Sequence, residues 1–110
     1  MKTVLITGAN QGIGLAVASL LATDGDNYQV YIGSRDPAKG EAAVKKLRLA
    51  GARHLSCLQL DVTDPVSVKS AAQRLAKEIN TLDILINNAA IAGDQEQRIH
   101  VGSLDNLRAI

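Results

Sequence analysis

Three glycines, Gly8, Gly12 and Gly14, follow the first apolar run of the chain at a spacing that suits anion binding. In a strand-to-helix turn, the first glycine lets the chain turn sharply, the second lets backbone amides approach a ligand, and the third lets the helix pack against the strand. Free amides and the positive end of the helix dipole then favour a diphosphate. The turn predicts a dinucleotide-binding loop, and a purely structural tight turn is the alternative. The residues expected to form this loop are Gly8, Asn10, Gln11, Gly12, Ile13 and Gly14.

Polar side chains also follow three later apolar runs. Ser34 and Arg35 come after one run, Asp61 after the next, and Asn87 and Asn88 after the last. If these runs are parallel strands, their carboxyl ends meet at one edge of a sheet, where ligands of open α/β sheets bind. The sequence therefore predicts that the glycine loop and these polar residues form one site.

The elements that must position these residues are short apolar runs that alternate with segments of helical periodicity, a pattern typical of βαβ units. We expect strands at residues 4–6, 29–33, 55–60 and 82–86, and helices at residues 15–22, 37–50 and 65–79. The pairs Asp36-Pro37 and Asp64-Pro65 mark two helix starts, because an Asp side chain caps free amides and Pro tolerates the first helical position. Gly51 is the expected C-terminal cap of the second helix.

This order of elements predicts an α/β fold of the Rossmann type, with three layers. Right-handed crossovers give a four-stranded parallel sheet of order 3-2-1-4 with helices on both faces. The 110 residues, 46% of them apolar, are expected to form a single domain. Residues 93–110 are expected to be a polar loop and the start of a further helix. The fourth strand would then be an edge strand with unpaired backbone groups.

Composition excludes several classes of function. A net charge of +1 and an aromatic content of 2% provide neither a basic stripe nor a stacking surface for nucleic acid. The single cysteine, Cys57, excludes an internal disulfide, and with His54 and His100 alone it cannot form a metal site. No apolar stretch approaches the roughly 20 residues that cross a bilayer. A reduced, cytoplasmic setting is therefore expected, with no nucleic-acid or membrane partner.

Three motifs resemble those of the short-chain dehydrogenase/reductase family. Residues 7–14 match its Thr-Gly-x-x-x-Gly-x-Gly opening, Asp61-Val62 matches its Asp-Val pair, and residues 87–90 stand where the family has Asn-Asn-Ala-Gly, with alanine in place of the last glycine. The resemblance extends from Lys2 to about Gly93. Within the family, the glycine turn and the segment after the second strand are most similar to the carbonyl-reductase type.

The end of the second strand favours NADP(H) over NAD(H). NAD-specific enzymes place a carboxylate there, which repels a 2′-phosphate, whereas this chain has Ser34 and Arg35. A guanidinium suits phosphate because it forms two charge-assisted bonds at once. Two residues favour NAD(H) instead. Asp36 follows Arg35 directly, although capping a helix competes for its carboxylate. Gln11 stands where NADP-dependent relatives often have a cation. The alternative for Arg35 is a solvated surface residue.

The resemblance also implies roles for residues at the ends of the third and fourth strands. Asp61 would accept a bond from the adenine amino group, and the Val62 amide would meet a ring nitrogen. The alternative is that Asp61 only begins a turn. Asn87, Asn88 and Ala89 would line the ribose and diphosphate side of the cofactor, and one of the asparagines would also tie neighbouring strands together.

No catalytic residue can be assigned. The family uses a Tyr-x-x-x-Lys motif, a serine and an asparagine, but neither Tyr28 nor Tyr31 is followed by lysine four residues later. Ser103 is not at the position of the catalytic serine, and Asn106 comes too early. The chain is therefore expected to be truncated relative to the family.

Three functions remain open on the sequence alone. By resemblance, the chain is an NADP(H)-dependent oxidoreductase that interconverts small carbonyls and alcohols. The first alternative is a truncated, inactive fragment that binds a dinucleotide. The second is an interaction module that recruits a partner, or another copy of itself, through the open edge of the fourth strand.

Overall fold

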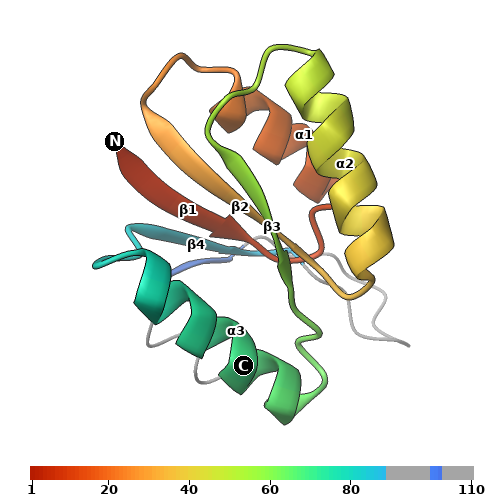
Figure 1. The fold of residues 1–110 in the computed structure, drawn as a ribbon, viewed down its shortest axis with the longest axis vertical. Coiled ribbons are helices and arrows are strands. Elements are labelled where there is room, and N and C mark those ends of the chain that lie inside the picture. Colours follow the sequence, from red (N-terminus) through yellow and green to blue (C-terminus); the bar gives the residue numbers. More distant parts are fainter. Residues whose placement is uncertain (89–99, 103–110) are drawn as a thin grey trace.

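The computed structural model describes residues 1–88 and the backbone of residues 100–102. Its helices and strands (Figure 1) are β1 Lys2–Ile6, α1 Gly12–Ala22, β2 Tyr28–Ser34, α2 Pro37–Leu49, β3 Leu55–Gln59, α3 Pro65–Glu78, β4 Ile84–Asn87 and β5 His100–Gly102. Every expected strand and helix up to residue 88 is present. α1 begins three residues before the expected start, because the glycine turn itself forms the first helical turn.

The sheet has the order β3-β2-β1-β4-β5, and its first four strands are parallel. The predicted order 3-2-1-4 is therefore confirmed. β1 lies in the middle, with Val4 opposite both Val30 and Ile84. Because β1 is paired on both sides and covered on both faces, all of its last three residues are buried.

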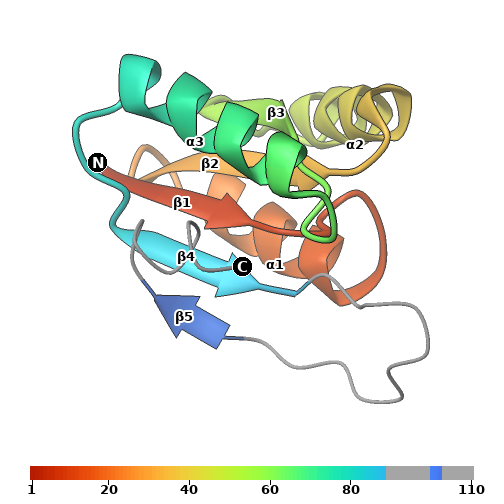
Figure 2. The same ribbon diagram turned by 90° about the horizontal axis from the view of Figure 1, so that it is seen from below.

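Two separate apolar clusters hold helices to the two faces of the sheet. Val4 and Ile6 pack with residues of α1 and α2, while Leu5, which points to the opposite face, packs with residues of α3 such as Leu75. Figure 1 shows the resulting three layers, with α1 and α2 on one side of the strands and α3 on the other, and Figure 2 shows the strands side by side. The core is aliphatic apart from Tyr31 and Tyr28, which belong to β2.

The edge of the sheet differs from the sequence prediction. β5 pairs antiparallel with β4, and Gly102 lies opposite Leu85 while His100 lies opposite Asn87. The expected unpaired edge is therefore wrong for residues 85–87, because a nearby extended segment takes up the backbone groups that a bare edge would expose. β5 lies within residues 93–110, which were expected to be a loop and the start of a helix, and the rest of that segment lies outside the described residues.

The helix ends follow local chemistry. Asp36 and Asp64 are the N-caps of α2 and α3, and their carboxylates accept bonds from Ala38 N at 2.9 Å and Val66 N at 3.0 Å. Gly51 follows the C-cap of α2 with φ of +107°, a left-handed conformation that favours glycine. Both Asp-Pro helix starts are thus confirmed.

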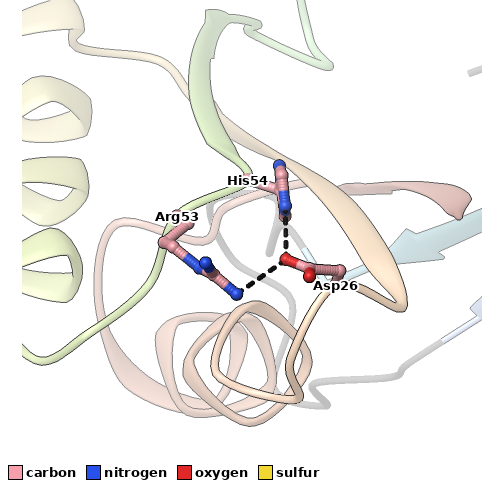
Figure 3. Close-up of polar contacts among 3 residues, drawn as sticks. All are labelled: Asp26, Arg53 and His54. Carbon is pink, nitrogen blue, oxygen red and sulfur yellow. Dashed lines mark hydrogen bonds and ion pairs between the residues drawn. The ribbon is translucent and has the colours of Figure 1, made fainter.

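One ion cluster ties the loops at the amino ends of β2 and β3. Asp26 Oδ1 accepts bonds from Arg53 Nη2 at 2.9 Å and His54 Nε2 at 2.7 Å (Figure 3). The His54 bond, followed by the Arg53 charge, lowers the pKa of the exposed Asp26 carboxyl. Because ligands of open α/β sheets bind at the carboxyl ends of the strands, we interpret this cluster as structural.

Candidate functional site

A cleft of about 400 Å³ lies beyond the carboxyl ends of the parallel strands. It is lined by Gly8, Asn10, Gln11, Gly12, Ile13, Arg35, Leu60, Asp61, Val62, Thr63 and Asn88. The structure thus brings together predicted residues from the glycine turn and from the ends of β2, β3 and β4. Leu60 and Thr63 are additions that the sequence reasoning did not name, although each lies within two residues of Asp61.

Three of the predicted site residues that the structure describes are not among those that line the cleft. Ser34 is fully buried, and its hydroxyl donates to Asp36 O at 2.8 Å. Asn87 is half-buried on β4, and Ala89 lies outside the described residues. Gly14 is buried inside the fold.

Gly14 is required for packing. A Cβ built on Gly14 would lie 2.5 Å from Asn88 Nδ2, 2.8 Å from Gly8 O and 2.9 Å from Ala9 Cα. Real Cβ atoms essentially never approach so closely, so only glycine lets α1 reach this position against the end of β4. This is the helix-packing task that the third glycine of such a turn performs.

The amino terminus of α1 differs from those of α2 and α3. Gln11 is its N-cap and makes no side-chain capping bond, whereas Asp36 and Asp64 cap α2 and α3. Gly8 and Gly12 have φ of +61° and +62°, and nothing lies within 4 Å of a Cβ built on Gly12. The backbone amides at the start of α1, unlike those that Asp36 and Asp64 cap, therefore have no side-chain cap and can receive an anion.

Asp61 combines a turn with a place on the cleft wall. Its Oδ1 accepts bonds from Thr63 Oγ1 at 2.6 Å and Thr63 N at 3.0 Å. These two bonds, with a further contribution from the Arg35 charge, hold the pKa of the Asp61 carboxyl below its usual value, so it is ionised at neutral pH. The turn that the sequence offered as an alternative is present, and it leaves Oδ2 without a hydrogen-bond partner among the described residues.

Arg35 and Asp36 are neighbours with different positions. Arg35 lines the cleft, and among the described lining residues it is the only cation. The Asp36 carboxylate caps α2 through Ala38 N, and Asp36 is not part of the cleft wall. The Asp36 carboxylate, which could bind a ribose hydroxyl and would repel a 2′-phosphate, thus caps α2 instead.

Asn88 ties the end of β4 to the glycine turn. Its backbone N–H donates to Thr7 Oγ1 at 2.9 Å, and its Nδ2 donates to Gly8 O at 3.3 Å. Its Oδ1 is buried without a hydrogen-bond partner among the described residues, which is unusual for a polar atom inside a protein. Thr7, which the sequence reasoning did not single out, is fixed by this arrangement at the base of the turn.

No group of three or more His, Cys, Asp and Glu side chains within the described residues is placed to hold a metal ion. No helix in residues 1–88 has the length and apolar character needed to cross a membrane. Among the described residues that line the cleft, Arg35 provides a cation and Asp61 a carboxylate.

The sequence is similar to those of known proteins. The family model described as short chain dehydrogenase matches residues 2–107. Carbonyl reductase [NADPH] 1 of Sus scrofa is 43% identical over 93 residues, which cover 83% of this chain and 31% of the relative. Short-chain dehydrogenase anuI of Penicillium roqueforti is 42% identical over 88 residues, which cover 80% of this chain and 34% of the relative. The chain thus spans about a third of the length of the curated relatives it matches.

Solved structures agree with the sequence relatives. Menthone neomenthol reductase from Mentha piperita superposes with a TM-score of 0.77 at 35% identity, over 84% of this chain and 32% of that one. Salutaridine reductase from Papaver somniferum gives 0.77 at 36% identity, over 84% and 31%. Together with the strand order and the glycine turn, these matches show that the chain belongs to the short-chain dehydrogenase family of oxidoreductases.

Proposed function

We propose that this chain forms the NADP(H)-binding part of an oxidoreductase that interconverts small carbonyls and alcohols. The observation that carries the proposal is the position of Arg35 on the cleft wall while the neighbouring Asp36 carboxylate caps α2. A guanidinium without a competing carboxylate favours the 2′-phosphate that distinguishes NADP(H) from NAD(H).

The other walls of the cleft suit the remaining parts of a dinucleotide. The uncapped amino terminus of α1 can receive the diphosphate. Asp61 and Val62, beyond β3, can hold the adenine through a carboxylate oxygen and a backbone amide. Asn88, at the end of β4, lines the same cleft and can contact a ribose.

Names of relatives support the choice of cofactor. Two matched relatives, from Sus scrofa and Homo sapiens, are named carbonyl reductase [NADPH], at 43% and 42% identity. A matched structure, the F189W form of actinorhodin polyketide ketoreductase, is described with NADPH and is 28% identical. In the proposed reaction, bound NADPH supplies the hydride for a carbonyl carbon, and the chain's own residues bind and orient the carrier.

In the proposed reaction, turnover would also use the Tyr-x-x-x-Lys motif that the family resemblance implies. Neither tyrosine of the sequence is followed by lysine four residues later. We therefore expect the 110-residue chain by itself to bind the dinucleotide without oxidising NADPH in the presence of ketones. Measurable NADPH consumption by the purified chain would contradict this part of the proposal.

The decisive experiment is a pair of fluorescence titrations with NADPH and NADH. We expect the unaltered chain to bind NADPH at least about tenfold more tightly, since hydrogen bonds to charged groups contribute about 1.5–3 kcal/mol. Arg35→Asp should abolish this preference. Lys45→Asp, which makes the same change of charge at an exposed position of α2 outside the cleft, should keep it. Unchanged NADPH affinity in Arg35→Asp would overturn the assignment.

A further inference from the structure

A chain of hydrogen bonds behind the cleft links the loop after β2 to the loop after β3. The Asp61 N–H donates to Ser67 Oγ at 2.8 Å, and Ser67 Oγ donates to Gln59 Oε1 at 3.0 Å. Gln59 Nε2 then donates to Arg35 O at 3.3 Å. The two residues at the ends of this chain line the cleft, and the two in its middle do not.

Each bond in the chain fixes the direction of the next. Because Ser67 Oγ accepts from a backbone N–H, its own hydrogen is free to be donated, and Gln59 Oε1 receives it. This contact turns the Gln59 amide so that its NH₂ group faces the Arg35 carbonyl. Ser67 is 6% exposed, so water does not readily replace it as the partner of the Asp61 amide.

We propose that Gln59 and Ser67 are positioning residues that fix the adenosine-phosphate end of the cleft, an inference that rests on the proposed function. Gln59 restrains the backbone of Arg35, the residue assigned to the 2′-phosphate. Ser67 restrains Asp61, assigned to the adenine, and through Gln59 it also restrains Arg35. Gln59 therefore acts on the part of the site assigned to the 2′-phosphate, whereas Ser67 acts on that part and on the part assigned to the adenine.

Substitutions of Gln59 and Ser67 should therefore change the affinities for NADPH and NADH differently. Gln59→Met keeps the length of the side chain but removes both of its hydrogen bonds, and it should weaken NADPH binding by about five- to tenfold with little effect on NADH. Ser67→Ala should weaken both cofactors, because the adenine is common to both. Ser67→Thr retains the hydroxyl and should restore binding. Gln73→Met makes the same change at an exposed glutamine of α3 outside the cleft and should alter neither affinity.

The test is a titration of each variant with NADPH and with NADH, accompanied by thermal unfolding. A merely structural role would lower the unfolding temperature and weaken both cofactors in proportion, so a changed NADPH-to-NADH ratio in Gln59→Met supports positioning. The proposal is overturned if that ratio stays the same, or if Ser67→Thr binds no better than Ser67→Ala. If the unaltered chain binds neither cofactor, the proposed function fails first. If the unaltered chain binds both cofactors, and Gln59→Met and Ser67→Ala bind them as tightly as the unaltered chain does, the positioning inference fails while the proposed function stands.

Discussion

Gly12 and Gly25 allow the role of the glycine turn to be separated from simple backbone strain. Their φ values are +62° and +56°, and in each case an added methyl group would meet nothing within 4 Å. Gly12 lines the cleft, whereas Gly25 lies in the turn between α1 and β2 and does not. Alanine at either position therefore carries the same conformational cost, and only one of the two changes reaches the proposed ligand.

The expected effect on stability is the same for Gly12→Ala and Gly25→Ala. A left-handed conformation costs a non-glycine residue about 1–2 kcal/mol, partly offset by the lower entropy of the unfolded chain. A net loss of about 1 kcal/mol corresponds to a fall of about 5 °C in the unfolding temperature of a domain of this size. Differential scanning fluorimetry of the two variants, side by side, measures this loss.

Binding should separate the two variants. At Gly12 the added methyl group occupies open space over the amino terminus of α1, where backbone amides would approach a diphosphate. We expect Gly12→Ala to bind NADPH at least about tenfold more weakly than Gly25→Ala, because bonds to a charged group are lost. If the two variants bind NADPH equally well, the glycine turn serves only to shape the chain, and its interpretation as a dinucleotide-binding loop is refuted.

Three further outcomes test the packing and the electrostatics. Gly14→Ala should destabilise the chain by about 1–3 kcal/mol in chemical denaturation, because its methyl group would overlap the Asn88 amide. Burial, followed by a hydrogen bond to Glu78, raises the pKa of Tyr31 to about 12, so its contribution to stability is complete below pH 10 and is lost as the pH rises towards 12. Absorbance titration should show a phenol ionising near pH 12 that is absent from Tyr31→Phe. The lowered pKa of the Asp61 carboxyl stabilises the fold at pH values above 3.8, its ordinary pKa, and this stabilisation is lost as the pH falls below 3.8. Chemical denaturation at several acidic pH values should therefore show that the free energy of unfolding depends less on pH in Asp61→Asn than in the unaltered chain.

The fold was predictable because each local signal agreed with the overall pattern. Asp36 and Asp64 mark their helix starts through a cap that depends only on neighbouring residues. The central strand was recognisable because a strand buried on both faces has a continuous apolar sequence. β5 was not predictable, because a three-residue strand at an edge depends on which segment comes near β4 and not on its own composition.

The site was predictable in its outline but not in each residue. Glycine spacing and the strand ends pointed to the correct edge of the sheet, where the cleft lies. The sequence could not tell that the Ser34 hydroxyl turns inward to Asp36, because a buried and a ligand-facing serine look alike in a sequence. Nor could it show the Ser67 link to Asp61, since that contact depends on how α3 packs beside the end of β3.

The proposed cofactor preference of this chain depends on where α2 begins. Pro37 starts the helix, which makes Asp36 the N-cap and directs its carboxylate to the Ala38 amide. The Ser34 hydroxyl is buried and donates to Asp36 O. Arg35 is therefore the polar residue of this stretch that lines the cleft. Counting carboxylates near the end of β2 without locating the helix start would assign NAD(H). Once capping is taken into account, the same sequence favours NADP(H), because the Asp36 carboxylate, the one carboxylate of this stretch, caps α2.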